Sequence, residues 1–201
     1  MIQKWLVLFC LCFLGAEDIH AAPSPALTLS QLEAALNRIT TLKARFQQTG
    51  RKGALTSGWF FWERPGKVRF DYDAPNPNLI IAENGPLYHV DKELKERSEI
   101  PRSNPLYLFL KTIISFRQKG TRVLCFAKKE GVVQLTLAVN RESGMLTLFF
   151  DVATLHLQRW ILEDDEHNQT MVELEDCVYG EKFSPAVFQL MELPKGNTKK
   201  E

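Results

Sequence analysis

The sequence has few of the residues from which catalytic and metal sites are built. Its 201 residues include four cysteines and four histidines. The histidines His20, His89, His156 and His167 are scattered singly, and no Cys-x-x-Cys or His-x-x-x-His spacing occurs. An enzyme needs a nucleophile, a base and an orienting group that converge. We therefore expect no enzymatic activity, no cofactor and no metal site.

The chain also lacks an excess of either charge. It has 25 Lys and Arg residues against 24 Asp and Glu residues, a formal net charge of +1 at pH 7. Proteins that bind nucleic acids carry a clustered basic excess toward the phosphates. The composition therefore predicts a protein without a nucleic-acid-binding face.

Only one long apolar run is present, and it lies at the start. Residues 5–14 (WLVLFCLCFL) follow the basic Lys4 and precede the small residues Ala21 and Ala22. This layout is typical of a secretory signal peptide, and the run is half the roughly 20 residues of a membrane-spanning helix. We expect cleavage after Ala21, a leader over 1–21, and one mature domain over 22–201. An uncleaved membrane anchor is the alternative.

The cysteines of the leader do not fit a lipid-modification site. Bulky residues precede both Cys10 and Cys12, where a lipobox has a small residue. The mature protein is thus expected to be exported, soluble and not lipidated. Cys125 and Cys177 remain after export, and an oxidising compartment permits a disulfide between them. Buried free thiols are equally ordinary, so the sequence leaves this pairing open.

Two segments carry helix signals. The residues Ser-Gln-Leu-Glu at 30–33 form a capping box, and Leu32, Leu36 and Ile39 follow at helical spacing. This first helix should end between residues 40 and 42. Pro105 suits the first turn of a second helix, which the bulky side chains of residues 106–116 continue.

The rest of the chain alternates with the period of β-strands. Val68, Phe70 and Tyr72 share one face, and Arg69, Asp71 and Asp73 share the other. Short strands separated by turn residues indicate an antiparallel sheet. The expected strands lie at 43–51, 59–62, 67–73, 79–83, 87–91, 122–127, 132–139, 146–152, 155–162, 170–178 and 186–190. We predict an α+β domain with one long, curved sheet.

Apolar side chains are abundant for so few helices. The 13 phenylalanines and four tryptophans could fill an ordinary core or leave a hydrophobic cavity on the concave face of the sheet. Arg64 shares the parity of Phe60, Trp62, Phe70 and Tyr72, which would direct its guanidinium to that face. A cation there requires acceptors, and the carbonyls at a helix C-terminus are suitable. A bulge at Pro65-Gly66 that turns Arg64 outward is the alternative.

An ordered set of motifs resembles the periplasmic outer-membrane lipoprotein carrier (LolA-like) family. The matching segments are Phe-Gln-Gln at 46–48, Gly58, Glu-Arg-Pro at 63–65, Arg-Phe-Asp-Tyr at 69–72, Pro75, residues 80–85, Tyr-His-Val-Asp at 88–91, Asn-Pro-Leu-Tyr-Leu-Phe-Leu at 104–110, Phe183, Phe188 and Pro-Lys-Gly at 194–196. They extend over nearly the whole mature chain.

The resemblance implies an incomplete β-barrel whose hydrophobic cavity is covered by a helical lid. Arg64 would hold the lid shut through hydrogen bonds. The acyl-chain cavity would be lined by Leu32, Leu36, Phe60, Trp62, Val68, Phe70, Tyr72, Leu106, Tyr107 and Phe109. Segment 104–110 would be the lid helix, and Phe183 and Phe188 would belong to a closing strand.

The resemblance also implies a periplasmic, monomeric carrier. It would accept acylated lipoproteins from an inner-membrane lipoprotein-releasing ABC transporter and pass them to an outer-membrane acceptor or to the outer membrane itself. The alternatives are a lipid- or glycolipid-binding envelope protein or sensor of the same fold, an enzyme that uses the cavity, and a structural envelope protein with a filled core.

Overall fold

The structure is a computed structural model that describes residues 27–139 and 144–190. The expected signal peptide at 1–21, its cleavage point and the Pro-Lys-Gly motif at 194–196 lie outside these residues. No helix in the described part is long and apolar enough to cross a bilayer.

Eleven strands of the described chain form one antiparallel sheet that does not close on itself. Its order is β6-β5-β4-β3-β2-β1-β11-β10-β9-β8-β7, so the two edges are formed by β6 and β7. The expected open antiparallel sheet is confirmed. The strands are β1 (Thr41–Thr49), β2 (Leu55–Glu63), β3 (Lys67–Tyr72), β4 (Asn78–Glu83), β5 (Tyr88–Asp91), β6 (Glu96–Glu99), β7 (Thr121–Lys129), β8 (Val132–Val139), β9 (Met145–Asp151), β10 (Leu157–Glu163) and β11 (Gln169–Tyr179).

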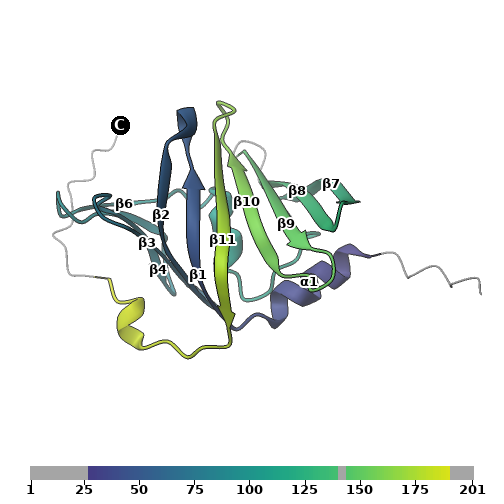
Figure 1. Cartoon of the computed structure of the whole chain (residues 1–201), viewed down its shortest axis with the longest axis horizontal. Helices are drawn as coiled ribbons and strands as arrows, with labels where there is room; N and C mark the ends of the chain where they lie inside the picture. The colour runs from purple at the N-terminus through teal and green to yellow at the C-terminus, as the bar shows by residue number, and fades with distance from the viewer. Residues whose placement is uncertain (1–26, 140–143, 191–201) are drawn as a thin grey trace, which may run out of the picture.

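The strand order explains why one segment must cover the concave face. β1 to β6 form one meander, β7 to β11 form another, and the pairing of β1 with β11 joins them. The chain therefore passes from the edge strand β6 to the opposite edge strand β7 through residues 100–120. In Figure 1 the outer strands recede behind β1 and β11, and this connection lies behind the sheet. Its 3₁₀ helix η2 (Pro105–Leu110) packs on the face that the curved sheet encloses.

The one α-helix of the described residues, α1 (Leu29–Arg38), begins two residues earlier than the sequence suggests. The side chain of Thr28 accepts a hydrogen bond from the backbone N–H of Gln31, and the side chain of Gln31 accepts one from Thr28. The expected box of Ser30 and Glu33 does not form, and Glu33 instead accepts hydrogen bonds from Ser115 and Phe116. The helix ends at Arg38, since Ile39 already has extended dihedrals.

The expected second helix is wrong over its second half, and its first half is a 3₁₀ helix. Asn104 caps η2, which ends at Leu110, and Lys111 has extended dihedrals of φ −72° and ψ 140°. The β-branched residues Thr112, Ile113 and Ile114 follow at once, and such residues lose side-chain freedom in a helix. Residues 111–116 thus form an irregular loop instead of further helical turns.

The expected strand at 186–190 is also wrong. Pro185 lacks the N–H that a strand interior needs, and it opens the 3₁₀ helix η3 (Pro185–Val187). Phe183 and Phe188 therefore do not form a closing strand. Conversely, β6 was missed because its Glu-Arg-Ser-Glu sequence has no apolar residue. The short 3₁₀ helix η1 (Arg51–Gly53) completes the regular elements.

The main core follows the alternation of the strands. Phe60 pairs with Phe70, Trp62 with Val68, and Gly58 with Tyr72, so these side chains share the concave face. No residue with a side chain fits at Gly58. A Cβ atom at this position would lie 2.7 Å from the Phe46 ring and would collide with the backbone oxygen of Asp71.

A smaller apolar cluster lies on the opposite face. Leu79, Ile81 and Val90 are buried there against Leu190. The segment after β11 covers this face, with the ring of Phe183 5.6 Å from that of Phe61. Both cysteines are free: Cys125 in β7 and Cys177 in β11 are separated by three strands of the sheet.

Candidate functional site

Arg64 connects the sheet to the segments that cover it. Arg64 is the first residue of the turn after β2. Its guanidinium donates hydrogen bonds to the carbonyl oxygen of Leu36 (2.6 Å), the side-chain oxygen of Asn37 (2.8 Å) and the carbonyl oxygen of Thr112 (2.9 Å). The first two acceptors lie in the last turn of α1, and the third lies in the loop after η2. One side chain thus joins three parts of the fold.

The acceptors suit a cation because the last carbonyls of a helix have no partners within the helix and carry partial negative charge. Burial lowers the pKa of Arg64 from its ordinary value. A guanidinium begins so far above neutrality that it stays charged. It also lies 5.6 Å from the centre of the Trp62 ring. The structure therefore directs Arg64 toward the covering segments; that these bonds hold the site shut remains a prediction.

Two polar residues of α1 tie the helix to the loop at 111–116. The side chain of Asn37 donates to the carbonyl oxygen of Ile114 (2.8 Å) and accepts from its N–H (2.9 Å). The carboxylate of Glu33 accepts from the N–H of Phe116 at 2.6 Å and from the hydroxyl of Ser115 at 3.2 Å. We call α1 and residues 105–116 the cover. These contacts join its two parts into one unit that rests on the sheet.

Asn37→Ala is expected to lower the free energy of unfolding by about 1–3 kcal/mol, because the backbone groups of Ile114 and one Arg64 donor would lose their partner. Urea denaturation followed by tryptophan fluorescence measures this loss. Asn37 was missed in the sequence because a lone polar residue at a helix end carries no signal of its partner. As a control, Ser30→Ala changes an exposed residue of α1 and should leave stability nearly unchanged. Equal effects of the two variants would contradict the coupling role of Asn37.

The ten residues expected to line a cavity all lie in one apolar cluster beneath the cover. Nine of them are buried, and Tyr107 is partly buried. The residues come from α1 (Leu32 and Leu36), β2 (Phe60 and Trp62), β3 (Val68, Phe70 and Tyr72) and η2 (Leu106, Tyr107 and Phe109).

Phe109 of η2 occupies the centre of this cluster. Its ring lies 5.3 Å from Trp62, 5.2 Å from Trp160 and 6.4 Å from Phe60, measured between ring centres. The backbone oxygen of Phe109 also accepts a 2.6 Å hydrogen bond from the indole N–H of Trp62. Within the described residues the sheet and the cover fill the concave face with their own side chains. The expected open cavity and helical lid are therefore not confirmed.

Most polar side chains of the cluster have a hydrogen-bond partner within the protein. The Tyr72 hydroxyl bonds to the side-chain oxygen of Gln48 at 2.8 Å, and burial raises the pKa of Tyr72 to about 12. The Tyr107 hydroxyl donates to the carbonyl oxygen of Ile100 and accepts from the N–H of Leu87, both at 3.0 Å. Tyr107 thereby anchors η2 to the β5–β6 side of the sheet. Trp160 is not among the ten expected residues, and its buried indole nitrogen has no partner in the described structure.

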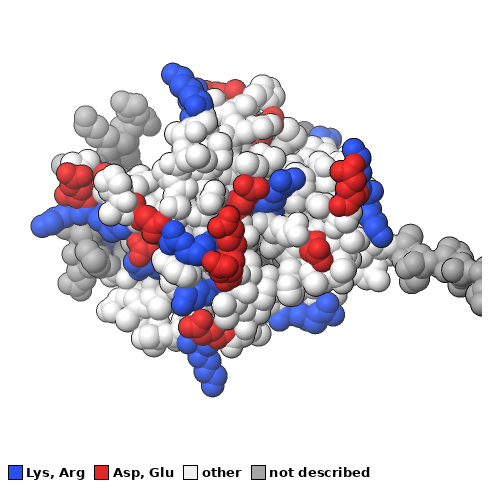
Figure 2. All heavy atoms as spheres, in the orientation of Figure 1, with Lys and Arg blue, Asp and Glu red and all other residues white. Residues whose placement is uncertain are grey.

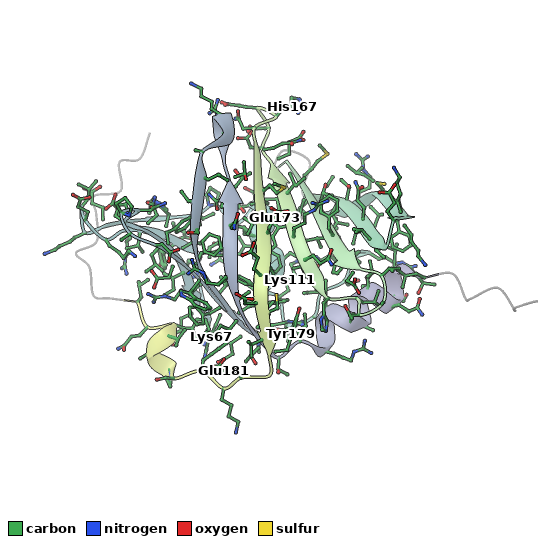
Figure 3. The ribbon with its side chains drawn as sticks, in the orientation of Figure 1. Lys67, Lys111, His167, Glu173, Tyr179 and Glu181 are labelled. Atoms are coloured by element: carbon green, nitrogen blue, oxygen red, sulfur yellow. The ribbon has the colours of Figure 1, made fainter. Side chains whose placement is uncertain are left out.

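Two hollows lie at the margins of the cover. One of about 310 Å³ lies between the C-terminal end of α1 and the ends of β1 and β11, where Arg38, Ile39, His156 and Tyr179 line it. Figure 3 shows Tyr179 at the end of β11 that adjoins α1. The other, of about 70 Å³, lies between η2 and the start of β7. Neither is lined by the central aromatic residues.

The described residues contain no group of three or more His, Cys, Asp or Glu side chains that could hold a metal ion. His89 lies in β5, and His156 and His167 lie in two different loops. His156 is exposed and its ring lies 4.3 Å from that of Tyr179. The functional candidate is the apolar cluster between the sheet and the cover.

Residues 37–191 match a protein family model described as outer membrane lipoprotein carrier protein LolA. An outer-membrane lipoprotein carrier protein of Methylococcus capsulatus is 31% identical over 96 residues, which are 45% of this chain and 44% of that protein. A protein of the same description from Pseudomonas aeruginosa is 34% identical over 88 residues, 41% of each chain. The aligned segments thus span less than half the length of these relatives.

A solved structure shares the fold. The crystal structure of an uncharacterised conserved protein from Thermus thermophilus superimposes with a TM-score of 0.52 and 10% sequence identity. The match covers 83% of this chain and 97% of that chain. An identity this low indicates a common fold alone.

Proposed function

The chain belongs to the outer membrane lipoprotein carrier protein family LolA, and from this we propose that it binds the acyl chains of lipoproteins between its sheet and its cover. The observation that carries the proposal is the construction of the site. A large apolar surface on the sheet lies under α1 and the loop at 111–116, which Asn37 and Glu33 join to each other, and Arg64 at the end of β2 bonds to both segments. Such a cover can separate from the sheet without the loss of a strand.

The mechanism is a physical exchange of apolar surfaces, in which no covalent bond forms or breaks. Burial of each methylene group of an acyl chain away from water contributes about 0.8 kcal/mol of favourable free energy. In the empty protein the same surface is occupied by Phe109 and its neighbours in the cover. Acyl chains would displace these side chains, and release of the cargo would let them return. Competition between cargo and cover keeps the affinity moderate, which a carrier requires.

Arg64 sets the balance between the two states in this scheme. Its hydrogen bonds to α1 and Thr112 exist only while the cover lies on the sheet. They therefore stabilise the empty, closed state and oppose binding. A ligand can shift such an equilibrium only by its difference in affinity for the two states.

The route and the partners are part of the proposal. We infer an exported protein that accepts lipoproteins at the inner membrane from a releasing ABC transporter and delivers them to an acceptor at the outer membrane or to the membrane itself. The family description, an outer membrane lipoprotein carrier protein, supports the cargo of this proposal. In this proposal Arg64 holds the cover on the sheet, and the ten residues expected to line the cavity contact the acyl chains.

Mass spectrometry of ligands that co-purify with the exported protein tests the proposal. We expect triacylated lipoproteins or their N-terminal peptides. Free lipids or glycolipids as the only ligands would instead identify a lipid-binding protein or sensor. A protein that emerges without ligand and does not bind a triacylated peptide in titration would overturn the carrier role.

A further inference from the structure

Basic residues are concentrated in one part of a chain that is otherwise close to neutral. Residues 100–129 include seven Lys and Arg residues and no Asp or Glu, although the whole chain has 25 basic and 24 acidic residues. This stretch comprises the crossing segment, with η2, and the edge strand β7. Such a one-sided distribution produces a local positive potential that the net charge does not reveal.

Three of these cations surround a single hollow. Arg102, Lys111 and Lys119 line the space of about 70 Å³ between η2 and β7, together with the polar residues Asn104 and Thr121. No carboxylate of the described residues lines it. Lys111 donates to the side-chain oxygen of Gln118 at 2.8 Å, and none of the three cations has an ion-pair partner in the part of the chain that the structure describes. Cations grouped without a counter-charge favour an anion such as a phosphate ester.

Large apolar side chains are exposed in the same stretch. Ile113 is 71% exposed in the loop of the cover, and Leu124 and Phe126 on β7 are 43% and 37% exposed. Segments that lie at the surface of an anionic membrane combine cations with exposed apolar side chains, because the cations meet the headgroups and the apolar groups enter the acyl boundary.

The outer face of the sheet has a different electrostatic character. Figure 2 shows acidic and basic side chains next to one another on it. Arg69 and Lys92 both pair with Asp71, and Arg45 pairs with Asp73. These charges are neutralised locally, so that this face offers no comparable potential. The hollow differs from this face because three cations share its lining and no carboxylate of the described residues does.

We propose that the hollow formed by Arg102, Lys111 and Lys119, together with the exposed Ile113 two residues after Lys111, is a docking surface for bilayers that contain anionic phospholipids. The cations would bind headgroup phosphates, and Ile113 would insert at the boundary of the acyl chains. Ile113 directly follows Thr112, whose carbonyl oxygen accepts from Arg64. Docking would thus bring the membrane close to the hydrogen bond between Arg64 and Thr112. This proposal goes beyond the carrier function and holds for the empty protein.

Vesicle flotation with the full-length mature protein tests the surface. Phosphatidylcholine vesicles with and without phosphatidylglycerol are the probes, at low and high salt. We expect binding only to the anionic vesicles and a loss of binding at high salt, because ions screen exposed charges. R102Q/K111Q/K119Q should weaken binding about 100-fold, at about fivefold for each cation near an anionic surface. Ile113→Ser should weaken it by roughly tenfold.

A matched variant separates this site from a general effect of net charge. R51Q/K52Q/K182Q removes the same number of charges from exposed residues outside the stretch and should bind vesicles about as the unchanged protein does. Equal losses in the two triple variants would overturn the proposal. Binding to neutral vesicles that does not depend on salt would also overturn it. The same holds if the protein binds no vesicles and binds only an acidic protein. Titration with a triacylated peptide in the absence of vesicles reports on the carrier function separately, so that either idea can fail alone.

Discussion

Arg64→Leu is expected to bind a triacylated peptide about 10- to 100-fold more tightly than the unchanged protein and to release it more slowly. The guanidinium makes charge-assisted hydrogen bonds with Leu36, Asn37 and Thr112. Leucine would remove these bonds from the closed state alone. Because most of them are exposed to solvent, we take their combined contribution as that of one hydrogen bond to a charged group, about 1.5–3 kcal/mol, which corresponds to the expected change in affinity. The apparent dissociation constant falls as the fraction of open protein rises.

Transfer of the peptide to acceptor membranes should slow in the same variant, because the closed state no longer competes with the cargo. Fluorescence titration measures the affinity, and a donor-to-vesicle transfer assay measures the release. Arg38→Leu is the matched control: Arg38 is an exposed residue of the same helix turn and has no side-chain hydrogen bond to the described loop at 111–116. Normal affinity and normal transfer by Arg64→Leu would refute the closing role of Arg64.

Phe109→Ala is expected to destabilise the empty protein by about 3–5 kcal/mol, as large-to-small changes of buried aromatic residues do. The same change should increase the affinity for acyl chains, because it removes the side chain that occupies their place. Opposite effects on stability and affinity are the signature of a residue that substitutes for the ligand. An ordinary core residue would lower stability without a gain in affinity.

Phe188→Ala provides the comparison for this variant. Phe188 is as fully buried as Phe109, but it packs with Phe183 in the segment after β11, away from the cover. It should lose similar stability and leave acyl binding unchanged. Thermal unfolding and titration with a fluorescent fatty acid give the two readouts. A Phe109→Ala protein that binds no better than the unchanged chain would show that the aromatic cluster is a permanent core.

The alternation of the strands was sufficient to predict which side chains share the inner face. Phe60, Trp62, Val68, Phe70 and Tyr72 follow a period of two in the sequence, and they lie together in the structure. Three predictions of secondary structure failed, each for a reason that the alternation does not report. Pro185 prevented the last strand, β-branched residues after Lys111 prevented the second helix, and the polar strand β6 was recognisable only by its pairing with β5.

The sequence by itself determined the antiparallel sheet and its apolar face, because side-chain period and turn residues are properties of neighbours along the chain. The tertiary structure alone decided what covers that face. The acceptors of Arg64 come from residues 27 to 48 positions away, and the ring that fills the site comes from Phe109. The parity of Arg64 and the preference of a cation for helix C-terminal carbonyls predicted the direction of its side chain, whereas its particular partners depend on how the cover packs on the sheet.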